Sequence, residues 1–166
     1  MNEYGFASTA AVKQFLKTAQ SYPLDYQPLL TQAKITPELL ADNNQRIAGA
    51  ALEQLLALLI DASGDACFGI RSAYYIEPAT YSVLGYAAMN CASLRELLAR
   101  VPVYERIVSD IGASSTDIEG GYVLQRWQCH FNDARVKRHT VESVLGSWMT
   151  YTRSLLDYDS SLIDCV

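Results

Sequence analysis

The stretch YVLQRWQCHF, residues 122–131, decides the fold class because its residues alternate between two faces. A period of two over this length predicts a strand. Glu119-Gly120-Gly121 before it is a turn signal, and residues 111–118 are rich in Gly, Ser and Thr, so we expect the two segments to pair as a hairpin. The face expected to point to the core carries Val123, Gln125, Trp127, Cys129 and Phe131.

Helical periodicity fills the chain before this hairpin. The clearest case is residues 47–63, where apolar residues recur with the spacing of one helix face. Gly64 follows at the position of a C-terminal cap. The apolar stripe of this helix consists of Leu52, Leu55, Leu56, Leu59 and Ile60.

Shorter helices are expected on either side of it. Residues 9–22 carry an apolar face, and Thr36-Pro37 has the N-cap and first-position signature of a short helix. Ser93 and Glu96 fit a capping box, and the helix that they begin is expected to kink or end at Pro102. Further helical stretches are expected at residues 24–34, 65–73 and 81–91.

Helical spacing returns after the hairpin and predicts one long helix from Asp133 to near Asp157. The chain is therefore expected to have an α+β fold, with a helical N-terminal half, a small antiparallel sheet and a long C-terminal helix. Because 166 residues suit one domain, we expect residues 1–166 to form a single unit.

Charge narrows the function classes. The formal net charge is −5, whereas proteins that bind nucleic acid gather Lys and Arg on one surface. The densest basic run is expected to be a solvated helix start, and it consists of Arg135, Lys137, Arg138 and His139. We therefore do not expect this chain alone to bind DNA well.

Several other classes lack their sequence signals. No apolar stretch reaches the roughly 20 residues of a membrane span, and the N-terminus has no secretory pattern, which predicts a cytoplasmic protein without a membrane partner. The four cysteines show no CxxC spacing. Cys129 and His130 are adjacent, so on a strand they point to opposite faces. We expect no metal site and no cofactor.

An ordered series of short motifs between residues 46 and 110 resembles a known family. It is similar to the N-terminal effector-binding domain of one subgroup of AraC-type bacterial transcription regulators, and the similarity covers roughly residues 20–157. The helical first half argues against the cupin barrel of the founding member. The motifs are Arg46-Ile47, Gly64-Asp65, Phe68-Gly69-Ile70-Arg71, Pro78, Leu84-Gly85-Tyr86-Ala87-Ala88-Met89 and Ala92-Ser93-Leu94-Arg95-Glu96-Leu97.

The resemblance implies a domain that binds a small-molecule effector, forms a homodimer and controls an attached DNA-binding domain. Family members continue into two helix-turn-helix units, which nothing in this chain resembles, so DNA would be a partner only through a C-terminal domain outside the chain. The alternative is a stand-alone small-molecule-binding protein. A small enzyme would need a convergent acid–base set, and since the sequence shows none we expect no enzymatic activity.

Tyrosines cluster around Pro78 and suit the wall of an effector pocket, since each combines an apolar ring with one polar group. Ordinary packing is the competing interpretation. These candidate ligand-binding residues are Tyr74, Tyr75, Tyr81 and Tyr86. Amino acids, fatty acids and small aromatic acids are all compatible with such a pocket.

The hairpin strand adds Arg126, Trp127 and His130 as candidate ligand-binding residues. Arg126 has the geometry to bind a carboxylate ligand with two hydrogen bonds. We favour the alternative that it pairs with Asp117 or Glu119 across the hairpin.

The long C-terminal helix is the first candidate for a dimer interface. Exposed Trp148, Met149 or Tyr151 would suit such a surface, because aromatic residues and Met are enriched at interfaces. The competing interpretation is that these three side chains pack inside their own domain.

Overall fold

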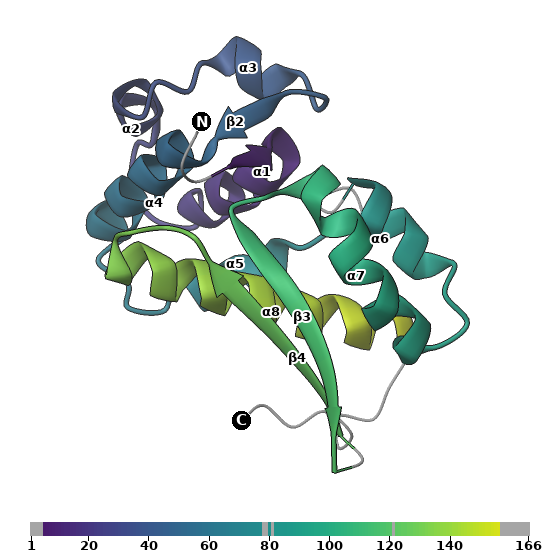
Figure 1. The fold of residues 1–166 in the computed structure, drawn as a ribbon. Coiled ribbons are helices and arrows are strands. Elements are labelled where there is room, and N and C mark those ends of the chain that lie inside the picture. Colours follow the sequence, from purple (N-terminus) through teal and green to yellow (C-terminus); the bar gives the residue numbers. More distant parts are fainter. Residues whose placement is uncertain (1–4, 78–79, 81, 121, 157–166) are drawn as a thin grey trace.

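The computed structural model describes residues 5–77, 80, 82–120 and 122–156. Helices and two small antiparallel sheets share this part of the chain (Figure 1), which confirms the predicted α+β class. No described helix has the length and apolar character needed to cross a membrane. In chain order the elements are β1 (Phe6–Ser8), α1 (Thr9–Ala19), α2 (Gln27–Gln32), α3 (Pro37–Ala41), β2 (Arg46–Ala48), α4 (Gly49–Ser63), α5 (Phe68–Ser72), the 3-10 turn η1 (Ala73–Tyr75), α6 (Ser82–Met89), α7 (Leu94–Val108), β3 (Gly112–Glu119), β4 (Tyr122–Cys129) and α8 (Ala134–Leu156).

Helix α4 forms the centre of the main core. The stripe expected from the sequence is buried, and the helix packs against α1, α2 and α8. It ends at Gly64, whose left-handed backbone (φ 62°) lets its N–H donate to the carbonyl of Ile60 at 3.1 Å. The helix, its buried face and its C-cap were therefore all predictable from local sequence.

The small sheet of β1 and β2 corrects one expectation. We expect the long helix to begin at Ile47 from its sequence, but Arg46–Ala48 forms β2, and α4 begins only at Gly49. Ile47 lies opposite Ala7 in the antiparallel pair. A three-residue strand is too short to show a period of two, and its partner lies far away in the chain, so the sequence gives no signal of this pairing.

Strands β3 and β4 form the predicted hairpin, with Gly112 opposite Cys129 and Glu119 opposite Tyr122. The face expected to be core is buried only near the base, at Cys129 and Phe131. Val123, placed on the same face by its period, is exposed. The reason is that the tip of the hairpin extends beyond the helices (Figure 1), so this half of the face meets no core.

Helix α8 is the predicted long helix, and it crosses α5 at close range. A Cβ atom at Gly69 of α5 would lie 2.2 Å from the carbonyl oxygen of His139, so only glycine allows this approach. The crossing buries His139, whose Nδ1 accepts a hydrogen bond from the Gly69 N–H at 3.1 Å.

The buried His139 corrects the expectation of a solvated basic run. Arg135 and Arg138 are exposed and form ion pairs with Asp61 and Glu142, as a solvated helix start requires. His139 lies one turn after the buried Val136 and therefore faces inward. Burial is the largest cause that lowers the pKa of His139 below its usual 6.5.

Helices α6 and α7 form a pair on the opposite side of the hairpin from α2 and α4 (Figure 1). The predicted capping box is present: Ser93 Oγ accepts from the N–H of Glu96 at 3.2 Å, and the Glu96 carboxylate accepts from the N–H of Ala92 at 2.8 Å. Helix α7 continues through Pro102 to Val108, so the proline does not end it.

The α6–α7 pair has a small core of its own. Leu84, Val101 and Val108 form a buried cluster that is separate from the main core, and Trp148 of α8 packs against it. The described part of the chain thus contains two hydrophobic cores that meet along the hairpin and α8.

Candidate ligand-binding cavity

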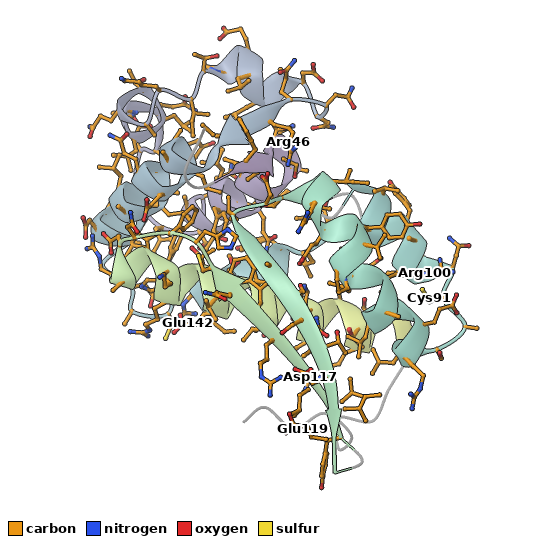
Figure 2. All side chains as sticks on the ribbon, viewed as in Figure 1. Arg46, Cys91, Arg100, Asp117, Glu119 and Glu142 are labelled. Atoms are coloured by element: carbon orange, nitrogen blue, oxygen red, sulfur yellow. The ribbon has the colours of Figure 1, made fainter. Side chains whose placement is uncertain are left out.

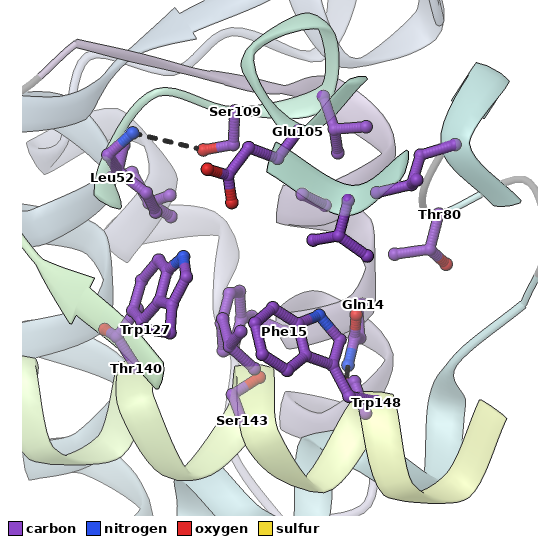
Figure 3. Close-up of a pocket in the computed structure, with 17 residues that line it drawn as sticks. Gln14, Phe15, Leu52, Thr80, Glu105, Ser109, Trp127, Thr140, Ser143 and Trp148 are labelled. Atoms are coloured by element: carbon purple, nitrogen blue, oxygen red, sulfur yellow. Dashed lines mark hydrogen bonds between the residues drawn. The ribbon is translucent and has the colours of Figure 1, made fainter. Parts of the chain in front are cut away.

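A cavity of about 80 Å³ lies where the two cores meet (Figure 3). Phe15, Leu52 and Ile111 line it from the main core, and Val101 and Val108 line it from the small core. Both tryptophans of the sequence, Trp127 and Trp148, also line it. A molecule in this cavity would therefore contact both cores at once.

The indole of Trp127 is held at the cavity by close packing on the neighbouring strand. A Cβ atom at Gly112 would lie 2.3 Å from Cζ2 of Trp127 and 2.6 Å from the carbonyl oxygen of Gln128. The ring thus occupies the space that any side chain at position 112 would need, and glycine there fixes the place of the indole.

Small hydroxyl side chains of α8 form the floor of the cavity. Thr140, Ser143 and Ser147 recur every three or four residues, which places them on one helix face. Ser143 Oγ lies 2.5 Å from Ser72 Oγ, and Ser72 donates to the carbonyl of Gly69 at 2.6 Å. These buried hydroxyls are satisfied within the protein, as buried polar groups generally are.

Gln14 of α1 presents an amide to the cavity. Its Nε2 donates to the carbonyl oxygen of Ser72 at 2.8 Å and to Ser147 Oγ at 2.9 Å. A carbonyl oxygen can only accept, so the contact with Ser72 determines which atom of the amide is the nitrogen. The Oε1 atom then lies on the other side, and Figure 3 shows it turned away from α8.

Glu105 of α7 supplies a carboxylate on the wall opposite α8 (Figure 3). This carboxylate accepts hydrogen bonds from the backbone N–H of Ser114, at 2.8 Å, and from the Ser114 hydroxyl. The contact joins α7 to β3, so it connects the α6–α7 pair to the hairpin as well as lining the cavity.

The family model for the N-terminal arabinose-binding domain of AraC transcription regulators matches residues 24–162. The chain belongs to this family. The match contains every motif on which the sequence resemblance depends, and it confirms that resemblance. The family is a class of ligand-binding regulatory domains and not a class of enzymes. A search of curated proteins gives no significant match to this chain.

Seven ligand-binding positions are predicted from the sequence. Among those that the structure describes, Trp127 alone lines the cavity. Tyr74 is 88% exposed and Tyr86 is 57% exposed. Tyr75 is half-buried, and Tyr81 lies outside the described residues. The tyrosine cluster around Pro78 is therefore not gathered at this cavity, and a ligand-binding role for it stays a prediction.

The other hairpin candidates also lie away from the cavity. Arg126 forms ion pairs with Asp117 and, at 3.6 Å, with Glu119, which is the alternative that we favour from the sequence. Both carboxylates lie towards the hairpin tip (Figure 2). His130 is exposed while Cys129 is buried, as expected for adjacent strand residues.

The three candidate dimerisation residues divide between interior and surface. Trp148 lines the cavity. Tyr151 is buried and donates to the carbonyl of Gly85 at 2.7 Å, and burial raises the pKa of its hydroxyl. Met149 is partly exposed. A dimer interface at these positions stays a prediction. An interface residue must be accessible to the partner, and Met149 is the most suitable of the three in this respect.

Sequence reasoning missed Gln14 and Glu105 as site residues. Successive residues of a helix lie about 100° apart, so a signal for Gln14 was its place on a different side of α1 from Lys13 and Lys17. The spacing of the small hydroxyl residues of α8 was a second signal. Within the described ranges no group of three or more His, Cys, Asp or Glu residues is arranged to hold a metal ion.

Proposed function

We propose that the chain senses a small organic effector in the cavity between its two cores and transmits binding to an attached DNA-binding domain. The observation that carries this proposal is the position of the cavity, whose walls come from both cores. Membership of a family of ligand-binding regulatory domains supports it. A ligand in such a position affects how the α6–α7 pair sits against the rest of the domain.

The size of the cavity suggests how sensing works. Its volume is about 80 Å³, whereas an engineered protein cavity that binds benzene has a volume of about 150 Å³. A ring-sized effector therefore requires a wider arrangement, which the α6–α7 pair supplies by moving away from the main core. An effector that binds the wider arrangement better shifts the population towards it.

The proposal includes a homodimer, as the family resemblance implies, and a DNA partner that is reached only through another domain. A regulator that binds an operator must be in the same compartment as the DNA, so we place the protein in the bacterial cytoplasm. Light scattering with and without effector tests the dimer. A protomer that remains monomeric at high concentration in both states would overturn this part of the proposal.

The two tryptophans provide a direct test of the effector site. A spectrum of ¹⁵N-labelled protein contains two indole N–H signals, and both report on the cavity. A metabolite screen should find compounds that shift these signals and raise the melting temperature, because a ligand at about 100 times its dissociation constant adds about 2.7 kcal/mol to the free energy of unfolding.

Two variants on one helix separate the cavity from the surface. Val101→Phe fills the cavity from α7, whereas Val103→Phe adds the same bulk to a side chain that is exposed on the same helix. Val101→Phe should abolish effector binding, and Val103→Phe should leave it unchanged. A folded Val101→Phe protein that binds the effector normally, or a screen that shifts neither indole signal with any chemical class, would contradict the proposal.

A further inference from the structure

We infer that the effector is a non-anionic molecule with an apolar body and an N–H or O–H group, which it donates to acceptors fixed in the cavity. This inference rests on the proposed function, because it names the chemical class of ligand for the same cavity. Three observations carry it: the free face of the Gln14 amide, the carboxylate of Glu105, and the absence of a cation among the described lining residues.

The Gln14 amide oxygen is a hydrogen-bond acceptor at the cavity wall. The side chain is only 6% exposed, and its nitrogen is already engaged with Ser72 and Ser147. Among the described residues, no hydrogen bond to Gln14 Oε1 is present. Because an amide oxygen accepts hydrogen bonds and cannot donate them, a ligand with an N–H or O–H group gains an interaction with this atom that a ligand without a donor cannot make.

Glu105 adds a second acceptor of the same kind. An ionised carboxylate accepts hydrogen bonds and cannot donate them. Ser114 supplies two hydrogen bonds to it, whereas two carboxylate oxygens have about four acceptor positions, so capacity remains for a ligand donor. The negative charge of Glu105 also repels an anion that enters the cavity.

The described residues that line the cavity include no Lys, Arg or His. The parts of the sequence outside the described ranges contain none of these residue types either. A carboxylate ligand would therefore lose its hydration without meeting a positive charge, which is strongly unfavourable in an apolar surrounding. This excludes the amino-acid, fatty-acid and aromatic-acid anions that the sequence leaves open.

A matched set of small ring compounds tests the inference without changing the protein. Benzyl alcohol is a neutral donor, benzylamine a cationic donor, benzyl methyl ether has no donor, and benzoate is an anion. Titrations that follow the two indole signals should give the tightest binding for the alcohol or the amine. Loss of one net hydrogen bond of about 1 kcal/mol predicts about fivefold weaker binding for the ether, and benzoate should bind more weakly still.

Two variants test the residues themselves. Glu105→Gln removes the negative charge and should reduce the difference in binding affinity between benzoate and benzyl alcohol. Gln14→Leu removes one of the two acceptors and should reduce the difference in affinity between the alcohol and the ether. Because Gln14→Leu also removes the contact to the Ser72 carbonyl and can impair folding, the ligand series on the unchanged protein remains the decisive measurement.

The possible outcomes distinguish a failure of the inferred ligand class from a failure of the proposed effector cavity. If the alcohol or the amine binds about fivefold more tightly than the ether and at least about tenfold more tightly than benzoate, the inferred class holds. If the ether binds as tightly as the alcohol, the requirement for a donor is wrong. If benzoate binds as tightly as the alcohol, the inferred class is wrong while the effector cavity stands. If no compound of any charge shifts either indole signal, the proposed cavity itself is wrong.

Discussion

Replacing Gly112 by alanine is expected to displace Trp127 and destabilise the domain. The added Cβ would lie 2.3 Å from the indole ring and 2.6 Å from the carbonyl oxygen of Gln128. Real Cβ atoms do not approach so closely, and neither neighbour is the flexible end of a side chain. The backbone at Gly112 has no positive φ, so the whole effect comes from this steric overlap.

The expected magnitude follows from overpacking. An extra methyl group in a well-packed site costs about 1–3 kcal/mol, and we expect the upper half of this range because a ring and a backbone group must both shift. For a chain of this length, that lowers the melting temperature by roughly 4–12 °C. Urea unfolding followed by circular dichroism gives the free energy of unfolding, and the indole N–H signal of Trp127 should move in the spectrum.

Gly64→Ala is the matched control, since it adds the same methyl group at a position with nothing within 4 Å. It should cost about 1 kcal/mol from the left-handed backbone conformation alone, with both indole signals unchanged. The reasoning would be refuted if Gly112→Ala changed the free energy of unfolding by less than about 0.5 kcal/mol and left the Trp127 signal in place.

Three further substitutions give expected outcomes. Tyr151→Phe removes the buried hydrogen bond to Gly85 and should lower the free energy of unfolding in urea by about 1 kcal/mol. Tyr86→Phe, at an exposed position, should leave it almost unchanged. Equal losses for the two variants would show that the hydrogen bond to Gly85 does not stabilise the protein. Arg126→Ala should change the free energy of unfolding by less than about 0.5 kcal/mol, because its ion pairs are exposed. It should also leave the affinity for benzyl alcohol unchanged. Weaker binding would show that Arg126 contributes to the ligand-binding site. Burial lowers the pKa of His139, so the folded protein takes up fewer protons than the unfolded chain as the pH falls below about 6.5. From about pH 7 to 5 the wild type should therefore lose more stability than His139→Asn. Parallel curves of the free energy of unfolding against pH for the two proteins would contradict this.

Local sequence was sufficient for the elements whose signals repeat. The leucine stripe of α4, the capping box at Ser93 and the period of two in β4 each involve residues close together in the chain, and each predicted element is present. The ordered motifs between residues 46 and 110 were also sufficient to indicate the family that the comparison confirms.

Short or solvent-facing elements were predicted less well. The β1–β2 pair has three residues in each strand and depends on a partner far away in the chain. Val123 follows the right period for the core, but the hairpin tip extends past the helices that would cover it. Whether a periodic face is buried depends on what lies opposite, which the strand itself does not specify.

The candidate site was the least predictable part, because it is assembled from elements that are distant in sequence. Trp127 was named as a candidate from the strand alone, whereas Gln14 and Glu105 read as ordinary helix residues until α1 and α7 are brought to the same cavity. The sequence by itself determined the longer helices, the β3–β4 hairpin, the family and the acidic charge, since these depend on residue types and local spacing. Only the tertiary structure decided where the two cores meet and which polar atoms face the space between them, because that depends on how distant helices pack.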